Sequence, residues 1–179
     1  MVQQMRKAGN ILIFFISAIF LFGGCAINRG LTSRVTVTLV NYINQGILSI
    51  AELEKKSLER YASVTGKNYT TDRRIQDELR DFIIPAYERF ADGLKTITPK
   101  DPEIQAAHAV YINAADLMLN GFRNKLTGIE QNNDNIIIEA NRKIEKARDE
   151  NEQWRKIIMS LYEKYGITEI DDNQPGIRP

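Results

Sequence analysis

The sequence of 179 residues predicts an all-α fold: an antiparallel up-down-up-down bundle of four long helices. Three observations support this fold class. From Thr32 onward, apolar residues recur at alternating spacings of three and four, as expected for helices that each bury one stripe. Helix start and stop signals divide this pattern into four segments of similar length. Short turns join the segments, and short connections make consecutive helices antiparallel neighbours.

The first helix is expected over residues 35–64. Its spacings predict shallow crossing angles and coiled-coil-like packing against the neighbouring helices. Gly66 follows the segment, and glycine readily adopts the left-handed conformation that ends a helix. The residues expected in its buried stripe are Leu39, Ile43, Gly46 or Ile47, Ile50, Leu53, Ser57 or Leu58, Tyr61 and Val64.

The second helix is expected over residues 71–97, with Thr70 or Thr71 as its N-cap. Pro85 lies inside this helix and removes one backbone hydrogen bond, which predicts a kink near that residue. Such a kink either bends the helix around its neighbours or marks a hinge or cavity. The residues expected in the buried stripe are Ile75, Leu79, Phe82, Ala86, Phe90 and Leu94.

The third helix is expected over residues 102–130, because Asp101 can act as N-cap and Pro102 suits the first helical position. Its apolar arc is wider than a bundle helix needs. Ile112 and Leu119 lie beside the core line, so we predict that they face a second subunit or a partner protein. The alternative is a broad core face that includes these flanking positions.

The fourth helix is expected over residues 134–165, after a turn-forming stretch in which Asn133 or Asp134 can cap it. Gly166 ends the helix. Residues 167–179 carry two prolines and a glycine without an apolar stripe, so they are expected to form a loose tail or one docked on the surface.

Two polar residues fall on apolar lines of these helices. Asn151 occupies an apolar position of the fourth helix, where it either fixes the register of packing or contacts a ligand. His108 faces the core of the third helix or its edge. It is expected to be a neutral imidazole at the core margin. The alternative is a non-covalent haem held between His108 and Met118 or Met159.

The composition argues against catalysis and metal binding. The chain holds one histidine and one cysteine, too few for the common zinc sites, and it contains no Glu-x-x-His pair for a di-iron bundle. No glycine-rich phosphate loop or hydrolase nucleophile turn is present. We therefore expect no enzyme activity, no metal and no resident cofactor. The near-neutral charge also gives no electrostatic basis for binding nucleic acid.

The N-terminal residues have the pattern of a secretory signal peptide. Arg6 and Lys7 precede the uncharged apolar stretch 11–22, and the small residues Gly23 and Gly24 follow it. The apolar core is shorter than the roughly 20 residues that span a bilayer. An uncleaved membrane anchor is the alternative, because the following residues lengthen the apolar tract.

The tetrapeptide Phe22-Gly23-Gly24-Cys25 resembles the lipobox of bacterial lipoproteins. In that class the cysteine receives acyl chains such as palmitate on its sulfur and becomes the mature N-terminus. The resemblance implies a lipid anchor on Cys25, which also accounts for an exported chain with a single, unpaired thiol. In enteric-type lipoproteins an aspartate after the cysteine retains the protein in the inner membrane. Here Ala26 follows the cysteine, so the resemblance implies sorting to the outer membrane, facing the periplasm.

The expected organisation is therefore a signal peptide (1–24), a lipidated tether (25–34), the bundle (35–166) and the tail (167–179). The tether spans at most about 35 Å when extended. We predict a cell-envelope lipoprotein whose bundle is a non-catalytic scaffold or protein-interaction module, with an envelope protein or a second copy as partner. The alternative is a bundle that binds a small apolar ligand or haem in a pocket near Pro85.

Overall fold

The computed structural model describes residues 25–27 and 34–169, and within them the chain is almost entirely helical. Four long helical segments follow one another, consistent with a helical bundle. The third is α6 (Pro102–Glu130) and the fourth is α7 (Asp134–Lys164), each an uninterrupted α-helix. The predicted helical class and the predicted positions of all four segments are confirmed.

The first and second segments are continuous helices that each contain a π-helical stretch. In the first, η1 (Tyr42–Ile47) lies between α2 (Arg34–Asn41) and α3 (Leu48–Val64). In the second, η3 (Leu79–Ile83) lies between α4 (Asp72–Glu78) and α5 (Ile84–Thr96). Single π-helical turns are rare and often occur at functional sites.

The expected end signals operate at the links between helices. The side-chain oxygen of Asp101 accepts hydrogen bonds from the backbone N–H of Glu103 and Ile104. Asn133 caps α7 in the same way, and Thr71 caps α4 by accepting from Arg74. Each cap satisfies backbone donors that the first helical turn leaves unpaired.

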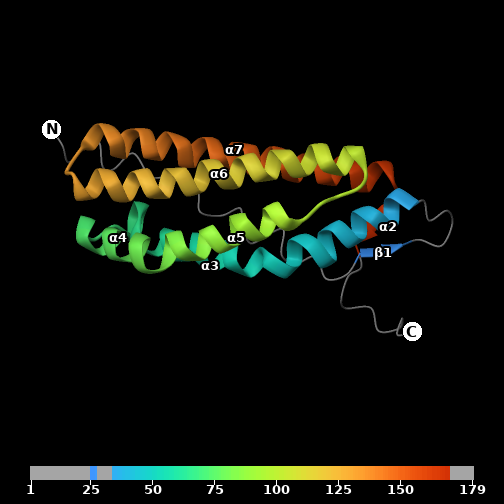
Figure 1. Cartoon of the computed structure of the whole chain (residues 1–179), viewed down its shortest axis with the longest axis horizontal. Helices are drawn as coiled ribbons and strands as arrows, with labels where there is room; N and C mark the ends of the chain where they lie inside the picture. The colour runs from blue at the N-terminus through green and yellow to red at the C-terminus, as the bar shows by residue number, and fades with distance from the viewer. Residues whose placement is uncertain (1–24, 28–33, 170–179) are drawn as a thin grey trace.

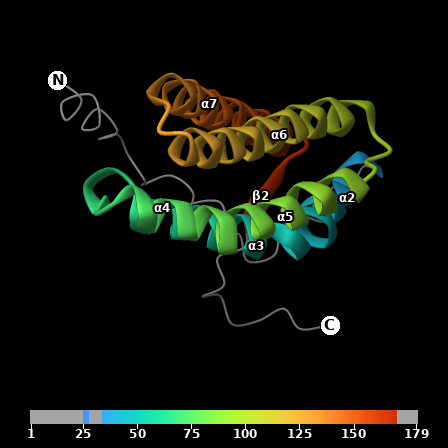
Figure 2. The same cartoon turned by 60° about the vertical axis from the view of Figure 1, so that its left-hand side comes forward.

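The helices form two layers. Figure 1 shows α6 and α7 side by side, joined by their short turn. Figure 2 shows this pair stacked on the layer that contains α3, α4 and α5. The core lies between the layers, where the ring of Phe122 in α6 meets Tyr61 of α3 at 4.8 Å and Tyr87 of α5 at 5.4 Å between centroids.

The π-helical stretch η3 changes which face of the second segment is buried. Leu79 and Ile83 are fully buried, whereas Phe82, expected in the core, is 37% exposed and lies beneath the guanidinium of Arg60. The prediction for Phe82 is wrong because it assumed a regular α-helical period. A π-turn takes one more residue per hydrogen-bonded ring, so the next core residue comes one position later.

The stretch η1 has the same effect on the first segment. Ile47 is buried as expected, but the next core residues are Ala51 and Glu54 in place of the predicted Ile50 and Leu53, which are only half-buried. Tyr61 and Val64 are buried as predicted. The correction therefore concerns the two turns that follow η1, and it brings a carboxylate into the core.

A short two-stranded sheet joins the two ends of the described chain. Strand β1 (Cys25–Ile27) pairs antiparallel with β2 (Ile167–Glu169), with Cys25 opposite Glu169. Ile167 is buried, so the tail, which was expected to be loose or docked on the surface, is docked at its first residue.

The predictions for the signal peptide (1–24), for residues 28–33 of the tether and for residues 170–179 of the tail lie outside the described residues. Among residues 25–27 and 34–169, no helix is both long enough and apolar enough to cross a membrane.

Candidate functional site

A buried carboxylate joins all four helical segments. Glu54 of α3 is 2% exposed, and its carboxylate accepts a hydrogen bond of 2.7 Å from the hydroxyl of Tyr111 in α6. The amide of Asn151 in α7 donates to the other carboxylate oxygen at 3.4 Å. The hydroxyl of Tyr87 in α5 is close enough to lower the pKa of this carboxylate. We call these four residues the Glu54 cluster.

The electrostatics of the cluster follow from its burial. Burial raises the pKa of Glu54 to about 7, because the charged form loses its hydration, while the hydrogen bonds from Tyr111, Tyr87 and Asn151 oppose this rise. Burial also raises the pKa of both tyrosines, and the negative charge of Glu54 raises it further. The tyrosines therefore remain protonated donors over the whole range in which Glu54 titrates.

No cation neutralises this carboxylate within the part of the chain that the structure describes, since its hydrogen-bonding groups are two hydroxyls and one amide. The other buried glutamate is different: Glu78 pairs with Arg60 at 2.6 Å and with Arg74 at 2.7 Å. Glu54 is thus a buried acid that is hydrogen-bonded but not ion-paired.

Sequence reasoning missed Glu54, although the sequence carries a signal for it. The residues three and four positions away are Ile50, Ala51, Ser57 and Leu58, so no basic side chain can pair with it along its own helix. Glu52, an exposed glutamate two positions earlier, has Lys55 and Lys56 at these spacings and pairs with both.

His108 lies in the same core, next to a second tyrosine. Nδ1 of His108 shares a hydrogen bond of 3.1 Å with the hydroxyl of Tyr42 in η1, and the two rings meet edge to face. The imidazole is 5% exposed, and burial lowers its pKa, although the carbonyls of Ile97 and Leu94 oppose this. Nε2 has no hydrogen-bond partner among the described residues. These surroundings favour the neutral imidazole.

Trp154 connects the two groups of polar residues. Its indole ring stacks on the ring of Tyr111 with 4.0 Å between centroids and 15° between planes. The indole also acts on Tyr42: its N–H lowers the pKa of that hydroxyl, although burial is the larger effect and raises it. The N–H has no hydrogen-bond partner among the described residues. Trp154 is the only tryptophan of the chain, so it reports on this region alone.

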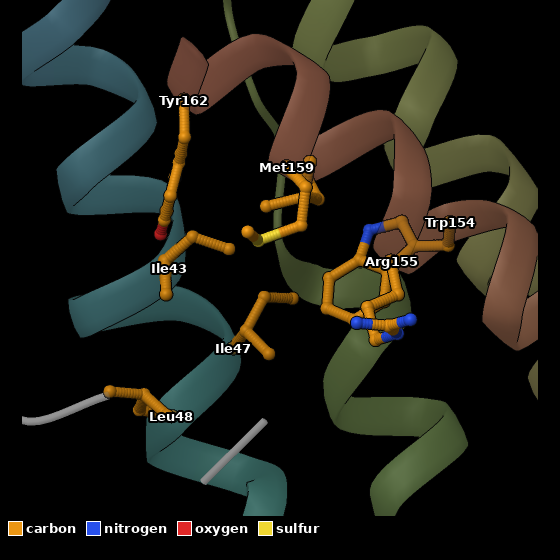
Figure 3. Close-up of a pocket in the computed structure, with 8 residues that line it drawn as sticks. Ile43, Ile47, Leu48, Trp154, Arg155, Met159 and Tyr162 are labelled. Carbon is orange, nitrogen blue, oxygen red and sulfur yellow. The ribbon is translucent and has the colours of Figure 1, made fainter. Parts of the chain in front are cut away.

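The pocket drawn in Figure 3 lies between the first and fourth helical segments. Ile43 and Ile47 from η1 face Met159 and Trp154 of α7 across it. Its volume is about 20 Å³ and its lining is apolar, whereas a small-molecule site needs about 300 Å³ or more. This pocket cannot hold a haem, and Pro85, near which the alternative hypothesis places a ligand pocket, is not among its lining residues.

Asn151 is placed against Glu54 and not against this pocket, so the two residues proposed as ligand contacts, His108 and Asn151, belong to the polar core. Within residues 25–27 and 34–169, no group of three or more histidine, cysteine, aspartate or glutamate residues is arranged to hold a metal ion.

The two residues predicted to face a partner differ in burial. Leu119 is 7% exposed and belongs to the core of this chain, so the prediction that its side chain faces a partner is wrong. The third helix buries a broad face because it packs against α7 on one side and α5 on the other. Ile112 is half-buried at the edge of the core, and its role at an interface stays a prediction.

Cys25 begins β1 and lies opposite Glu169 of β2. Comparisons with known protein families, curated proteins and solved structures find no match to this chain.

Proposed function

We propose that this chain is a bacterial cell-envelope lipoprotein, held at a membrane through acyl chains on Cys25, and that its helical bundle is a non-catalytic scaffold or protein-interaction module. The lipobox-like residues 22–25 and the signal-peptide pattern before them support the anchor. Removing residues 1–24 takes away Arg6 and Lys7 and brings the net charge from +1 to −1. A chain with this charge is not attracted to anionic lipid, so the acyl chains would provide the binding to the membrane.

The observation that carries the proposal is the position of Cys25. Its strand pairs with β2, which directly follows α7. A lipid on Cys25 would therefore hold that end of the bundle next to the bilayer, in place of a free tether of about 35 Å. Two or more acyl chains make such attachment stable, because each buried methylene contributes about 0.8 kcal/mol.

The finer architecture belongs to the same proposal. The helices run up-down-up-down, because the links between consecutive segments are short. The second segment bends near Pro85, whose ring removes one backbone hydrogen bond directly after the π-helical stretch η3.

A non-catalytic role is supported by the enclosure of the polar core. Glu54 and His108 are 2% and 5% exposed, so neither can reach a substrate at the surface of the folded bundle. Ala26 after the cysteine favours the outer membrane, with the bundle in the periplasm. The partner would be another envelope protein or a second copy of this chain.

The anchor is tested by intact mass and membrane fractionation of the full-length chain, the variant Cys25→Ala and the control Ser33→Ala. We expect the wild-type chain and the control to begin at Cys25 with added acyl mass and to fractionate with membranes. Cys25→Ala should lack acyl mass and keep its N-terminal residues or become soluble. A wild-type chain that keeps residues 1–24 without acyl mass would instead indicate an uncleaved membrane anchor.

The interaction role is tested at Ile112. This half-buried residue is the one predicted partner contact that does not lie in the core of the chain. Ile112→Glu is expected to reduce self-association or co-purification with an envelope protein, measured by sedimentation and by crosslinking in cells. Ala109→Glu, at an exposed position of the same helix, is the matched control. Equal association of both variants and the wild type would exclude this surface.

A further inference from the structure

The Glu54 cluster places one ionisable group where its charge must disturb all four helical segments at once. Glu54 comes from the first segment, Tyr87 from the second, Tyr111 from the third and Asn151 from the fourth. The carboxylate has no counter-ion among the described residues. An ionised carboxylate without a cation is expensive to bury, and hydrogen bonds repay only part of that free energy.

We propose that Glu54 is a proton-dependent switch of the bundle: the helices pack tightly around the neutral carboxyl group and loosen when it ionises. The same three side chains can serve both states. The hydroxyls and the amide can hydrogen-bond a protonated or an ionised carboxyl group, but only the ionised group carries an uncompensated charge into the core. This inference does not depend on the lipid anchor.

Most of the other titratable groups around the cluster do not change their charge near neutral pH, whereas Glu54 does. Tyr87, Tyr111 and Tyr42 have pKa values raised by burial, so they stay neutral. Asp116 of α6 acts on Tyr87 from a distance and pairs with Lys95 of α5 at 2.6 Å on the surface. Among the described residues of this core, His108 of α6 is the remaining titratable group, and its effect has the opposite sign.

The direction of the pH effect follows from the two pKa values of Glu54. The carboxyl group has a pKa of about 7 in the folded chain against an ordinary value of 4.5. Below about pH 4.5 both states are protonated and the folding equilibrium is unaffected. Between pH 4.5 and 7 the carboxyl group is ionised in the unfolded chain but still protonated in the folded chain, so stability falls as pH rises. Above pH 7 the fall is complete, and the equilibrium constant for folding is roughly 300-fold lower than at pH 4.5.

His108 opposes this trend at acidic pH. Its pKa in the folded chain lies below the ordinary 6.5, so the unfolded chain takes up a proton first as pH falls below about 6.5. The two contributions partly cancel in the wild type. The switch is therefore measured as the difference between the wild type and a variant in which only Glu54 is neutralised.

The experiment compares full-length wild type, Glu54→Gln and the control Glu52→Gln by denaturant unfolding in detergent from about pH 4.5 to 8.5. We expect the stability of Glu54→Gln relative to wild type to increase with pH up to about pH 7 and to level off above it. The control, whose side chain is exposed on the same helix, should follow the wild type at every pH. A constant difference between Glu54→Gln and wild type would overturn the proposal.

Trp154 gives a local readout of the same event, because its ring stacks on the tyrosine that donates to Glu54. We expect its fluorescence to titrate near pH 7 in the wild type and in His108→Gln, and not in Glu54→Gln. A titration that disappears in His108→Gln and persists in Glu54→Gln would assign the change to the imidazole and overturn the proposal.

Infrared difference spectroscopy of the wild type keeps the proposal testable if Glu54→Gln does not fold. We expect the carbonyl band of a protonated carboxyl group to disappear with a midpoint near pH 7, together with the change in Trp154 fluorescence. Complete ionisation of all carboxyl groups by about pH 5.5 would show that Glu54 is charged in the folded bundle and would overturn the switch.

Discussion

The helices of the first half of this molecule, α2 to α5, and those of the second half, α6 and α7, differ in their regularity and in how they pack. The second half, α6 and α7, consists of uninterrupted α-helices that approach closely at two glycines. A Cβ atom on Gly121 would lie 2.6 Å from Cγ1 of Ile144, and one on Gly128 would lie 2.7 Å from Cγ1 of Ile137. The first half contains both π-helical stretches and contributes Glu54 and Tyr87 to the polar core.

This difference indicates a division of roles between the halves. The regular half packs so closely that it can present Tyr111, Asn151 and Trp154 in fixed positions. The irregular half carries the ionisable group, and its π-helical turns rotate that group inward. The charge proposed to loosen the bundle therefore comes from the irregular half and acts on Tyr111 and Asn151, which belong to the regular half.

The largest expected effect tests the close packing of the second half. The double variant Gly121→Ala/Gly128→Ala forces side chains and backbone apart at both sites, and an overpacked site loses about 3 kcal/mol. Alanine regains about 1 kcal/mol of helix propensity at each site. We therefore expect a net loss of about 4 kcal/mol in the free energy of unfolding, since sites about 10 Å apart add nearly independently.

Gly93→Ala is the matched control for this prediction, because the nearest atom to the added Cβ would be Cγ2 of the half-buried Ile50 at 3.1 Å, a contact that a shift of a few tenths of an ångström relieves. Its free energy of unfolding should stay within about 1 kcal/mol of the wild type, measured by denaturant titration followed by circular dichroism. If the double variant were as stable as this control, the two halves would not differ in packing.

An intermediate effect is expected at the contact between the halves. Tyr111→Phe removes a donor to Glu54 and leaves a buried acceptor unsatisfied, which lowers the free energy of unfolding by about 2 kcal/mol. The loss should be constant below about pH 6 and grow as pH rises through and above about 7, where Glu54 ionises in the folded chain, because the missing hydrogen bond stabilises the charged form most.

Tyr165→Phe provides the comparison for this substitution. Its hydroxyl donates to Glu103 at the surface, so we expect a loss within about 0.5 kcal/mol and no additional pH dependence from the core. Equal losses in both variants at every pH would show that the hydroxyl of Tyr111 is no more important than one at the surface.

The smallest expected loss of stability concerns the N-cap of α7, in the turn between α6 and α7. Asn133→Ala removes the side chain that caps α7 and should lower the free energy of unfolding by about 1 kcal/mol. Asn133→Asp keeps the cap and adds a negative charge that favours the helix start, so it should match the wild type. A loss in both variants would contradict capping as the function of this side chain.

The sequence alone determined the local architecture. Apolar spacing and end signals at Thr71, Asp101 and Asn133 predicted the helical segments, because caps and amphipathic stripes are encoded within a few neighbouring residues. The same spacing marked His108 as a core residue. These are short-range properties, and they do not depend on which helices meet.

The tertiary structure decided which face of each irregular helix is buried and what the buried polar residues contact. The apolar spacing does not reveal the π-helical stretches Tyr42–Ile47 and Leu79–Ile83, so the exposure of Phe82 and the burial of Glu54 could not be predicted from a regular period. The burial of Leu119 and the pairing of β1 with β2 depend on neighbours distant in sequence. The pKa of Glu54 depends on side chains from three other helices, because only folding brings them around one carboxyl group and excludes water from it.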